Sequence, residues 1–166
     1  MDQIEKNQTW ELVPRPQNKN VIGTKWVFKN KVNENGQVIR NKSILVCKGY
    51  AQVEGVDFEE TFAHVARLEA IRMFLSFASY KKLKVYQMDV QSAFLNGSLE
   101  DEVYIEQLEG FQLTDKGDCV CKLKKALYGL KQAPRAWYAR LDSYLQIQGF
   151  KRESIDIIIY CKIIGD

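Results

Sequence analysis

Several features that mark other classes of protein are scarce or missing in this sequence. Its four cysteines, Cys47, Cys119, Cys121 and Cys161, form no Cys-x-x-Cys pair, and its single histidine, His64, is distant from the Cys119 and Cys121 pair. These spacings do not predict a zinc site, and ordinary strand residues are the better interpretation of Cys119 and Cys121. We expect reduced thiols in an intracellular protein, cytoplasmic or nuclear and not secreted.

Long apolar runs, repeats and low-complexity tracts are missing as well. The longest apolar stretches fall far short of the roughly 20 residues that cross a bilayer, and the polar opening MDQIEKNQ does not resemble a signal peptide. We therefore expect no transmembrane helix and no membrane partner. The net charge is only +3, from 24 Lys and Arg against 21 Asp and Glu, which is a weak lean toward polyanionic partners. A length of 166 residues with 46% apolar residues fits one globular domain.

Prolines number only three, so most of the chain is free to form regular structure. The stretch 14–20, PRPQNKN, is the clearest loop. Two extended, β-branched segments follow, 21–32 and 37–50, and the Asn35-Gly36 pair between them predicts a long β-hairpin. This hairpin is basic, with Lys25, Lys29, Lys31, Arg40, Lys42 and Lys48. Its cations either contact phosphates or guard a solvated edge against aggregation, and the two interpretations carry equal weight.

Periodicity predicts the remaining elements. A helix over 67–80 has one apolar face, which we expect to pack on another element. A second helix begins near Pro134, buries a stripe of Trp137, Leu141, Tyr144 and Leu145, and ends before Gly149. The predicted strands are 84–90, 103–106, 119–123 and a buried one at 155–164. Strands and helices in this order indicate an α+β fold.

Asp89 is the first candidate for chemistry, because it follows an apolar segment where a strand is expected to end. Its carboxylate can bind Mg²⁺, a hard cation that prefers oxygen and shares its shell with substrate phosphates. The alternative is a cap for a short helix beginning near Ser92. Chemistry that uses two metal ions needs a second acid, and the other candidates stand in loop-like, exposed contexts. They are Asp57, Glu59, Glu60, Glu100, Asp101 and Glu102.

Gln132 and His64 are weaker candidates. Gln132 stands between apolar neighbours just before the Pro134 helix, so its amide either meets a ligand at the start of that helix or serves as a cap. His64 lacks a Ser or Cys neighbour in a triad-like context and is expected to be a surface or half-buried loop residue.

Four long strings carry a resemblance that covers nearly the whole chain. They are WELVPRP (10–16), NVIGTKWVFKNK (20–31), YQMDVQSAFLNGSLEDEVYIEQ (86–107) and KLKKALYGLKQAPRAWY (122–138). Together they resemble the reverse transcriptase domain of copia-type retrotransposons, part of a Pol polyprotein. The resemblance implies a right-handed polymerase fold, with fingers at about 10–65 and a partial palm with interleaved helices at about 66–166. The basic hairpin would belong to the fingers, and antiparallel strands would pack on helices in the palm.

The resemblance also assigns roles to residues. Asp89 would be the catalytic ligand of Mg²⁺, the carbonyl of Val90 a further metal ligand, and Phe94 the gate against the ribose 2′-hydroxyl, the group that distinguishes RNA from DNA. Gln132 would contact the incoming nucleotide. Arg40 and Lys42 would close on its triphosphate. The implied partners are an RNA or DNA template-primer and deoxynucleoside triphosphates.

The departures from the family are informative. The paired-aspartate motif that completes the metal site, tyrosine-x-aspartate-aspartate, does not occur in residues 1–166, so the chain is expected to end before the catalytic hairpin and to be inactive alone. Ile44 replaces a usual arginine, and His64 and Leu108 replace usual prolines, which removes a charge-assisted contact and two rigid turns. The alternatives are a non-catalytic fragment that binds nucleic acid and a gene remnant without function.

Overall fold

The computed structural model describes residues 4, 6–154, 156–163 and 165. Strands and helices are mixed along the chain, as the sequence predicts. The elements are β1 (Trp10–Pro14), β2 (Val21–Ile22), β3 (Thr24–Val32), β4 (Val38–Cys47), the 3₁₀ turn η1 (Gly49–Ala51), α2 (Leu68–Tyr80), η2 (Ala93–Asn96), β5 (Tyr104–Ile105), η3 (Thr114–Lys116), β6 (Cys119–Leu123), α3 (Ala133–Ile147), β7 (Lys151–Arg152) and β8 (Tyr160–Cys161).

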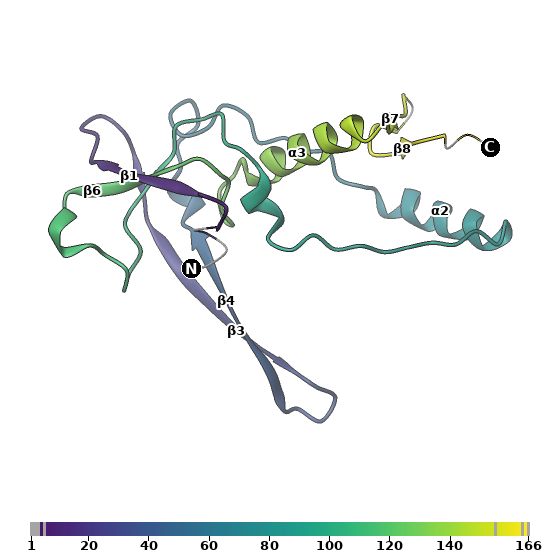
Figure 1. Ribbon diagram of the computed structural model, residues 1–166, viewed down its shortest axis with the longest axis horizontal. Helices are drawn as coiled ribbons and strands as arrows, with labels where there is room; N and C mark the ends of the chain where they lie inside the picture. Colours follow the sequence, from purple (N-terminus) through teal and green to yellow (C-terminus); the bar gives the residue numbers. More distant parts are fainter. Residues whose placement is uncertain (1–3, 5, 155, 164, 166) are drawn as a thin grey trace.

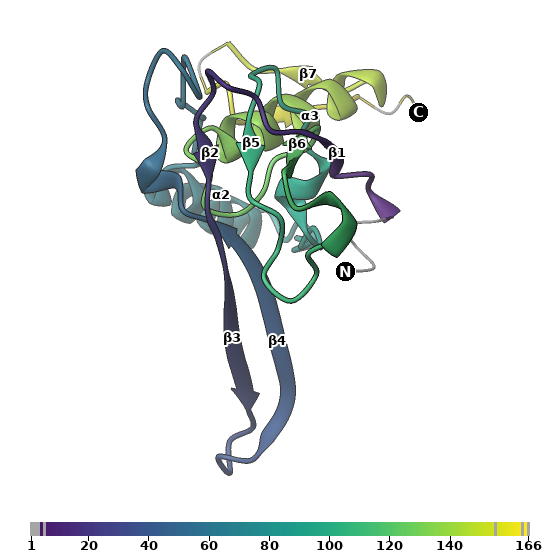
Figure 2. The ribbon, with the colours of Figure 1, turned by 90° about the vertical axis from the view of Figure 1, so that its left-hand side faces the viewer.

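A small sheet forms the body of the molecule. Its strand order is β1-β6-β5-β2, with β6 antiparallel to both β1 and β5 and with β2 parallel to β5. Figure 2 shows these strands side by side above the hairpin. The strands predicted at 103–106 and 119–123 are confirmed as β5 and β6, whereas β1 was not predicted. The parallel β2–β5 pair departs from the expectation of antiparallel strands alone.

The core lies where this sheet meets the base of the hairpin and the start of α3. Ile22, Val103 and Ile105 are completely buried, and Leu127 and Ala133 join them from the segment that leads into α3. Burying such side chains contributes roughly 1.5–3 kcal/mol each. The core thus joins buried residues of the segment 22–47 to those of the segment 95–133.

The predicted hairpin is confirmed and is the most prominent feature of the molecule. Strands β3 and β4 pair in antiparallel register and project far from the body (Figure 1). In the turn, Oδ1 of Asn33 accepts hydrogen bonds from the backbone N–H groups of Asn35 (3.0 Å) and Gln37 (2.9 Å). Gly36 has a φ of 75°, which favours glycine. Local turn chemistry therefore sets the hairpin register.

The base of the hairpin is held by the loop before α3. The backbone N–H of Cys47 donates to the carbonyl of Tyr128 at 2.8 Å, and Val46 forms a parallel β-bridge with Tyr128. The next residue, Gly129, has a φ of 91°, and a Cβ there would lie 2.2 Å from the carbonyl oxygen of Cys47. Only glycine allows the two backbones to approach this closely. The loop 127–129 therefore fixes the hairpin on the body.

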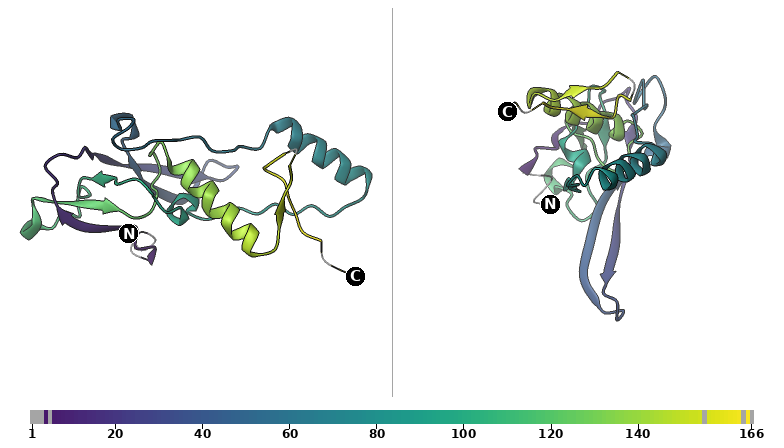
Figure 3. Two further views of the ribbon diagram at one scale, coloured as in Figure 1. Left: turned by 90° about the horizontal axis from the view of Figure 1, so that it is seen from above. Right: turned by 90° about the vertical axis from the view of Figure 1, so that its right-hand side faces the viewer.

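The two helices lie where the sequence predicts them, but both are more exposed than expected. In α2 the structure buries only Ala78, and Phe74 is 56% exposed, so the apolar face does not pack on another described element. In α3 only Ala133 is buried; Trp137, Leu141 and Leu145 are half-buried, and Tyr144 is 51% exposed. Figure 3 shows both helices extending away from the sheet. Among the described residues, no helix has both the length and the apolar character that a membrane span requires.

Two predicted strands are wrong. Residues 84–90 are extended but exposed and pair with no described strand. They run back from α2 toward η2 as an isolated segment (Figure 1). In 155–164 the described part contains only the short β8, which pairs with β7 and is not buried; Ile155 and Ile164 lie outside the described residues. A strand needs a partner to satisfy its backbone, and β-propensity alone does not supply one.

Candidate functional site

A groove of about 960 Å³ lies between the hairpin and the body. Its charged residues are Lys31, Arg40 and Lys42 from the hairpin and Asp89 from the isolated extended segment, and Val90 lies beside Asp89. The structure thus brings together four of the predicted site residues, Asp89, Val90, Arg40 and Lys42, from segments far apart in the sequence.

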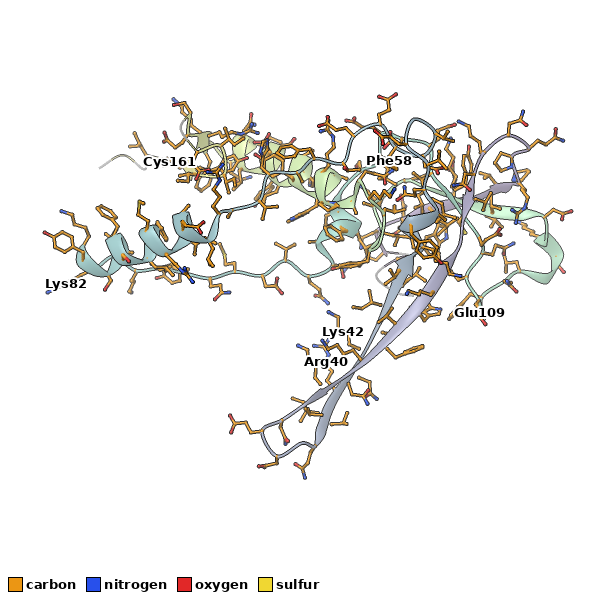
Figure 4. All side chains as sticks on the ribbon, turned by 180° about the vertical axis from the view of Figure 1, so that it is seen from behind. Arg40, Lys42, Phe58, Lys82, Glu109 and Cys161 are labelled. Carbon is orange, nitrogen blue, oxygen red and sulfur yellow. The ribbon has the colours of Figure 1, made fainter. Side chains whose placement is uncertain are left out.

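The cations of the hairpin are arranged on one face. Arg40 and Lys42 are two positions apart on β4, so they project on the same side, as Figure 4 shows. Lys31 stands directly opposite Arg40, and Lys29 directly opposite Lys42. Like charges opposite one another destabilise a sheet. None of these four cations forms an ion pair with any residue that the structure describes.

Asp89 is exposed at the mouth of this groove. Its carboxylate makes no hydrogen bond or ion pair with the described part of the chain. The alternative that Asp89 caps a short helix is wrong, because the residue before η2 is Ser92, which has a left-handed φ of 53° and forms no side-chain cap. The carboxylate is therefore free to meet a cation or a ligand in the groove.

The donor set in the groove suits one hard cation. Asp89 supplies carboxylate oxygens and Val90 supplies a carbonyl oxygen, the ligand types that Mg²⁺ prefers. Within the described residues, no group of three or more His, Cys, Asp or Glu side chains converges as a metal site. Asp89 and the carbonyl of Val90 would supply only part of the shell of one Mg²⁺ ion, with phosphate oxygens as its further ligands, and they do not suffice for a pair of ions.

Phe94 lies behind the wall of the groove. It is half-buried on η2 and packs against the core, and it is not among the residues that line the groove. Its ring centroid lies 4.8 Å from that of Tyr128, with the planes tilted by 56°. Tyr128 does line the groove. Tyr128 was not predicted as a residue of the groove. It lies in the segment 122–138, where no local sequence signal distinguishes it from its neighbours.

Gln132 does not line the groove that contains Asp89. It is 3% exposed and lines a second hollow of about 370 Å³, together with Asp101 and His64. Its Nε2 donates to the carbonyl of Asp57 at 2.9 Å, and its Oε1 accepts from Nε2 of Gln52 at 2.9 Å. The side chain is thus engaged within the protein, and its position lends no support to direct nucleotide contact.

Asp57 corrects another expectation. Instead of being exposed, it is 2% exposed, and its Oδ2 accepts hydrogen bonds from Nδ2 of Asn20 at 2.7 Å and from the backbone N–H of Val53 at 2.8 Å. The carboxylate of Asp57 holds the loop around it in place and does not line the groove.

The expectation for His64 is confirmed, since it is half-buried in a loop, with its ring against Phe62 and Tyr138.

Two departures from the family also have a place in the structure. Ile44 lines the groove on the same face of β4 as Lys42, so the position where the family resemblance led us to expect arginine faces the candidate site. Leu108 is 3% exposed and belongs to the core.

Cys47 lies at the base of the hairpin, where burial raises the pKa of its thiol to about 12, so the thiol is not a nucleophile at neutral pH.

Comparison with known proteins identifies the family. Residues 7–166 match the family model for reverse transcriptase (RNA-dependent DNA polymerase), and the chain therefore belongs to this family. It is 45% identical over 162 residues to the retrovirus-related Pol polyprotein from transposon TNT 1-94 of Nicotiana tabacum, covering 98% of this chain and 12% of the tobacco protein.

Further relatives agree with this family. Identity to the retrovirus-related Pol polyprotein from transposon RE2 of Arabidopsis thaliana is 45% over 155 residues, 93% of this chain and 11% of that protein. Identity to the transposon Ty1-DR4 Gag-Pol polyprotein of Saccharomyces cerevisiae is 29% over 150 residues, 87% of this chain and 9% of that protein. No solved structure shows a significant match. The chain therefore corresponds to a small part of a retrotransposon Pol polyprotein, and the resemblance to copia-type reverse transcriptases is confirmed.

Proposed function

We propose that this chain is the nucleotide-binding part of an RNA-directed DNA polymerase, with residues 10–65 as fingers and residues 66–166 as part of the palm. The observation that carries the proposal is the meeting of Asp89 and Val90 with Arg40 and Lys42 in one groove. The substrate is a deoxynucleoside triphosphate, and the polymer partner is an RNA or DNA template-primer.

The unpaired charges of the hairpin support binding of a polyanion. Four cations on one face, opposed in like-charged pairs, are stabilised by a polyanion that lies between them and the body. Arg40 and Lys42 contact the triphosphate from the hairpin side, while Asp89 and the carbonyl of Val90 would hold Mg²⁺. When bound, this ion neutralises charge on the phosphate oxygens.

The same geometry limits what the chain does alone. Asp89 is the only carboxylate among the described residues that line the groove. Holding two metal ions for phosphoryl transfer takes at least two convergent acids. The 166 residues by themselves are therefore expected to bind a nucleotide without adding it to a primer.

Isothermal titration of the chain with dGTP and Mg²⁺ tests the proposal. Replacing Arg40 and Lys42 by glutamine removes charge-assisted hydrogen bonds and should weaken binding about tenfold for each residue. Lys25→Gln is the matched control, because Lys25 lies on the same hairpin but does not line the groove. Equal losses in the control and in the groove variants would contradict the proposed site. Templated primer extension by the 166 residues alone would contradict the expected inactivity.

A second function is favoured by the reach of the hairpin, which projects far beyond the groove (Figure 2). As a non-catalytic clamp, it would grip a template through Lys29 and Lys31 without binding a mononucleotide. Affinity for an RNA–DNA hybrid would then fall steeply with salt and with lysine replacement, while dGTP produced no binding heat.

A further inference from the structure

The segment that carries Asp89 has few attachments of its own. Residues 84–91 are all exposed, and none of them makes a hydrogen bond or an ion pair with the part of the chain that the structure describes. The segment runs from the end of α2 to η2 (Figure 1). The first residue after it whose backbone is hydrogen-bonded is Ser92. The position of Asp89 in the groove therefore depends on how the chain turns at Ser92.

The backbone of Ser92 has a conformation that residues other than glycine seldom adopt. Its φ is 53° and its ψ is 43°, in the left-handed region. Such a conformation persists where the surrounding structure holds it. Here the Ser92 carbonyl accepts two hydrogen bonds, from the backbone N–H of Leu95 at 3.0 Å and from Nδ2 of Asn96 at 3.2 Å. The side chain of Asn96 therefore stabilises the turn that ends the Asp89 segment.

Asn96 is itself held in place by its two neighbours. Leu95 is 6% exposed and belongs to the core. The carbonyl of Gly97 accepts from the backbone N–H of Ala126 at 2.8 Å, and a Cβ at Gly97 would lie 2.7 Å from the carbonyl carbon of Ala136. The end of η2 thus lies directly against α3. Asn96 stands between two residues fixed by the body, and its side chain connects them to the turn.

The direction of this turn matters for the groove, because Asp89, Val90 and Ser92 all line it. Oxygen ligands of one Mg²⁺ ion must keep fixed positions relative to one another, since this ion demands near-ideal octahedral geometry. A turn that left the left-handed region would move the preceding residues relative to the body. Resting on the proposed nucleotide-binding function, we propose that Asn96 is a positioning residue, which holds the Ser92 carbonyl and so keeps Asp89 placed for the Mg²⁺ of the bound nucleotide.

The test measures the dissociation constant of the 166-residue chain for dGTP by isothermal titration, once with Mg²⁺ and once with EDTA. The ratio of the second constant to the first, here called the Mg²⁺ gain, is the informative quantity, because partial loss of folding weakens both constants alike. Asp89→Asn should bring the gain close to one. Asn96→Ala should lower it about fivefold, the change in population that one ordinary hydrogen bond produces. Asn96→Ser, whose hydroxyl can donate to the carbonyl four residues earlier, should keep most of it.

Asn20→Ala is the matched control. Nδ2 of Asn20 donates to the carbonyl of Ala51 at 2.9 Å and to Oδ2 of Asp57 at 2.7 Å, and Asn20 does not line the groove. Its loss should lower stability and leave the Mg²⁺ gain unchanged. A second measurement needs neither nucleotide nor metal: amide hydrogen exchange at Leu95, which donates to the same carbonyl as Asn96, should be faster in Asn96→Ala and unchanged in the control.

The outcomes distinguish the two proposals. If the unsubstituted chain binds no dGTP, or shows no Mg²⁺ gain, the proposed function fails and the role of Asn96 fails with it. If Asp89→Asn abolishes the gain and Asn96→Ala keeps it, the role of Asn96 is overturned while the proposed function stands. An equal loss of gain in Asn20→Ala would also overturn that role, because the effect would then follow stability alone. So would unchanged exchange at Leu95 in Asn96→Ala.

Discussion

Gln52 and Gln132, 80 positions apart in the sequence, are joined by a buried hydrogen bond of 2.9 Å from Nε2 of Gln52 to Oε1 of Gln132. Oε1 of Gln52 accepts in turn from the backbone N–H of Lys131, and Nε2 of Gln132 donates to the carbonyl of Asp57. These bonds tie the loop after η1 to the start of α3. The side-chain amide of Gln132, which the family resemblance assigned to contact with the nucleotide, is thus occupied by hydrogen bonds within the protein.

Gln132→Leu therefore tests which role this side chain has. Its loss leaves buried polar groups of Gln52 and Asp57 unpaired, so the free energy of unfolding should fall by about 1–3 kcal/mol. Urea denaturation measures this change. Gln148→Leu is the matched control, because Gln148 is exposed at the end of α3 and should change stability little. A fall in dGTP affinity with unchanged stability would instead favour direct nucleotide contact.

The close approach of two backbones at the base of the hairpin gives a second prediction. Gly129→Ala must strain a φ of 91° and also place a Cβ 2.2 Å from the carbonyl oxygen of Cys47. Gly36→Ala strains a φ of 75° but meets nothing within 4 Å. The Gly129 variant should lose about 1–3 kcal/mol more than the Gly36 variant, because it adds overpacking to the same backbone strain. Equal losses in urea denaturation would show that the contact relaxes freely.

The elements that the sequence predicted well are those with local signals. The hairpin has Asn35-Gly36 at its turn, and α3 has Pro134 in its first turn and Gly149 after its end. Strand β6 has apolar residues at four of its five positions, Lys122 being the exception. The strand expected at 84–90 has equally good β-propensity, yet it is not a strand, because no described segment supplies the hydrogen-bonding partner that the pattern cannot specify.

The residues of the candidate site likewise fall into those that the sequence predicted and those that it did not. The resemblance to copia-type reverse transcriptases pointed to Asp89, Arg40 and Lys42, and the structure places all three along one groove. The strings did not separate Gln132 from Tyr128, which stand four positions apart in one loop. Tyr128 lines the groove and Gln132 lines the second hollow, and between them in the sequence stands Gly129, whose backbone approaches that of Cys47, far away in the sequence.

Ile44 gives a third prediction, because it lines the groove on the face that carries Lys42. Ile44→Arg introduces the residue that the family resemblance led us to expect here and adds a donor for charge-assisted hydrogen bonds to a triphosphate. The affinity for dGTP should rise about tenfold. Phe28→Arg is the matched control, since Phe28 pairs with Ser43, projects from the opposite face of the hairpin to Ile44 and does not line the groove. An equal gain in dGTP affinity in both variants would show that the added positive charge, and not its position in the groove, causes the gain.

Cys47 gives a prediction about pH. Burial raises the pKa of its thiol to about 12, well above the ordinary value near 8.5. Between these two values the unfolded chain has lost the thiol proton while the folded chain keeps it. Since the folded state then binds more protons, stability is complete below about pH 8.5 and falls as the pH rises toward 12.

Cys47→Ala removes this contribution and provides the comparison. The variant should be less stable than the unsubstituted chain at pH 8, by about 1 kcal/mol for the lost packing of a small side chain. The difference should shrink as the pH is raised to 10.5, because only the chain with the thiol pays the cost of keeping it protonated. Urea midpoints measured at pH 8, 9.5 and 10.5 follow this change, and a constant difference across that range would show that the thiol titrates alike in the folded and unfolded states.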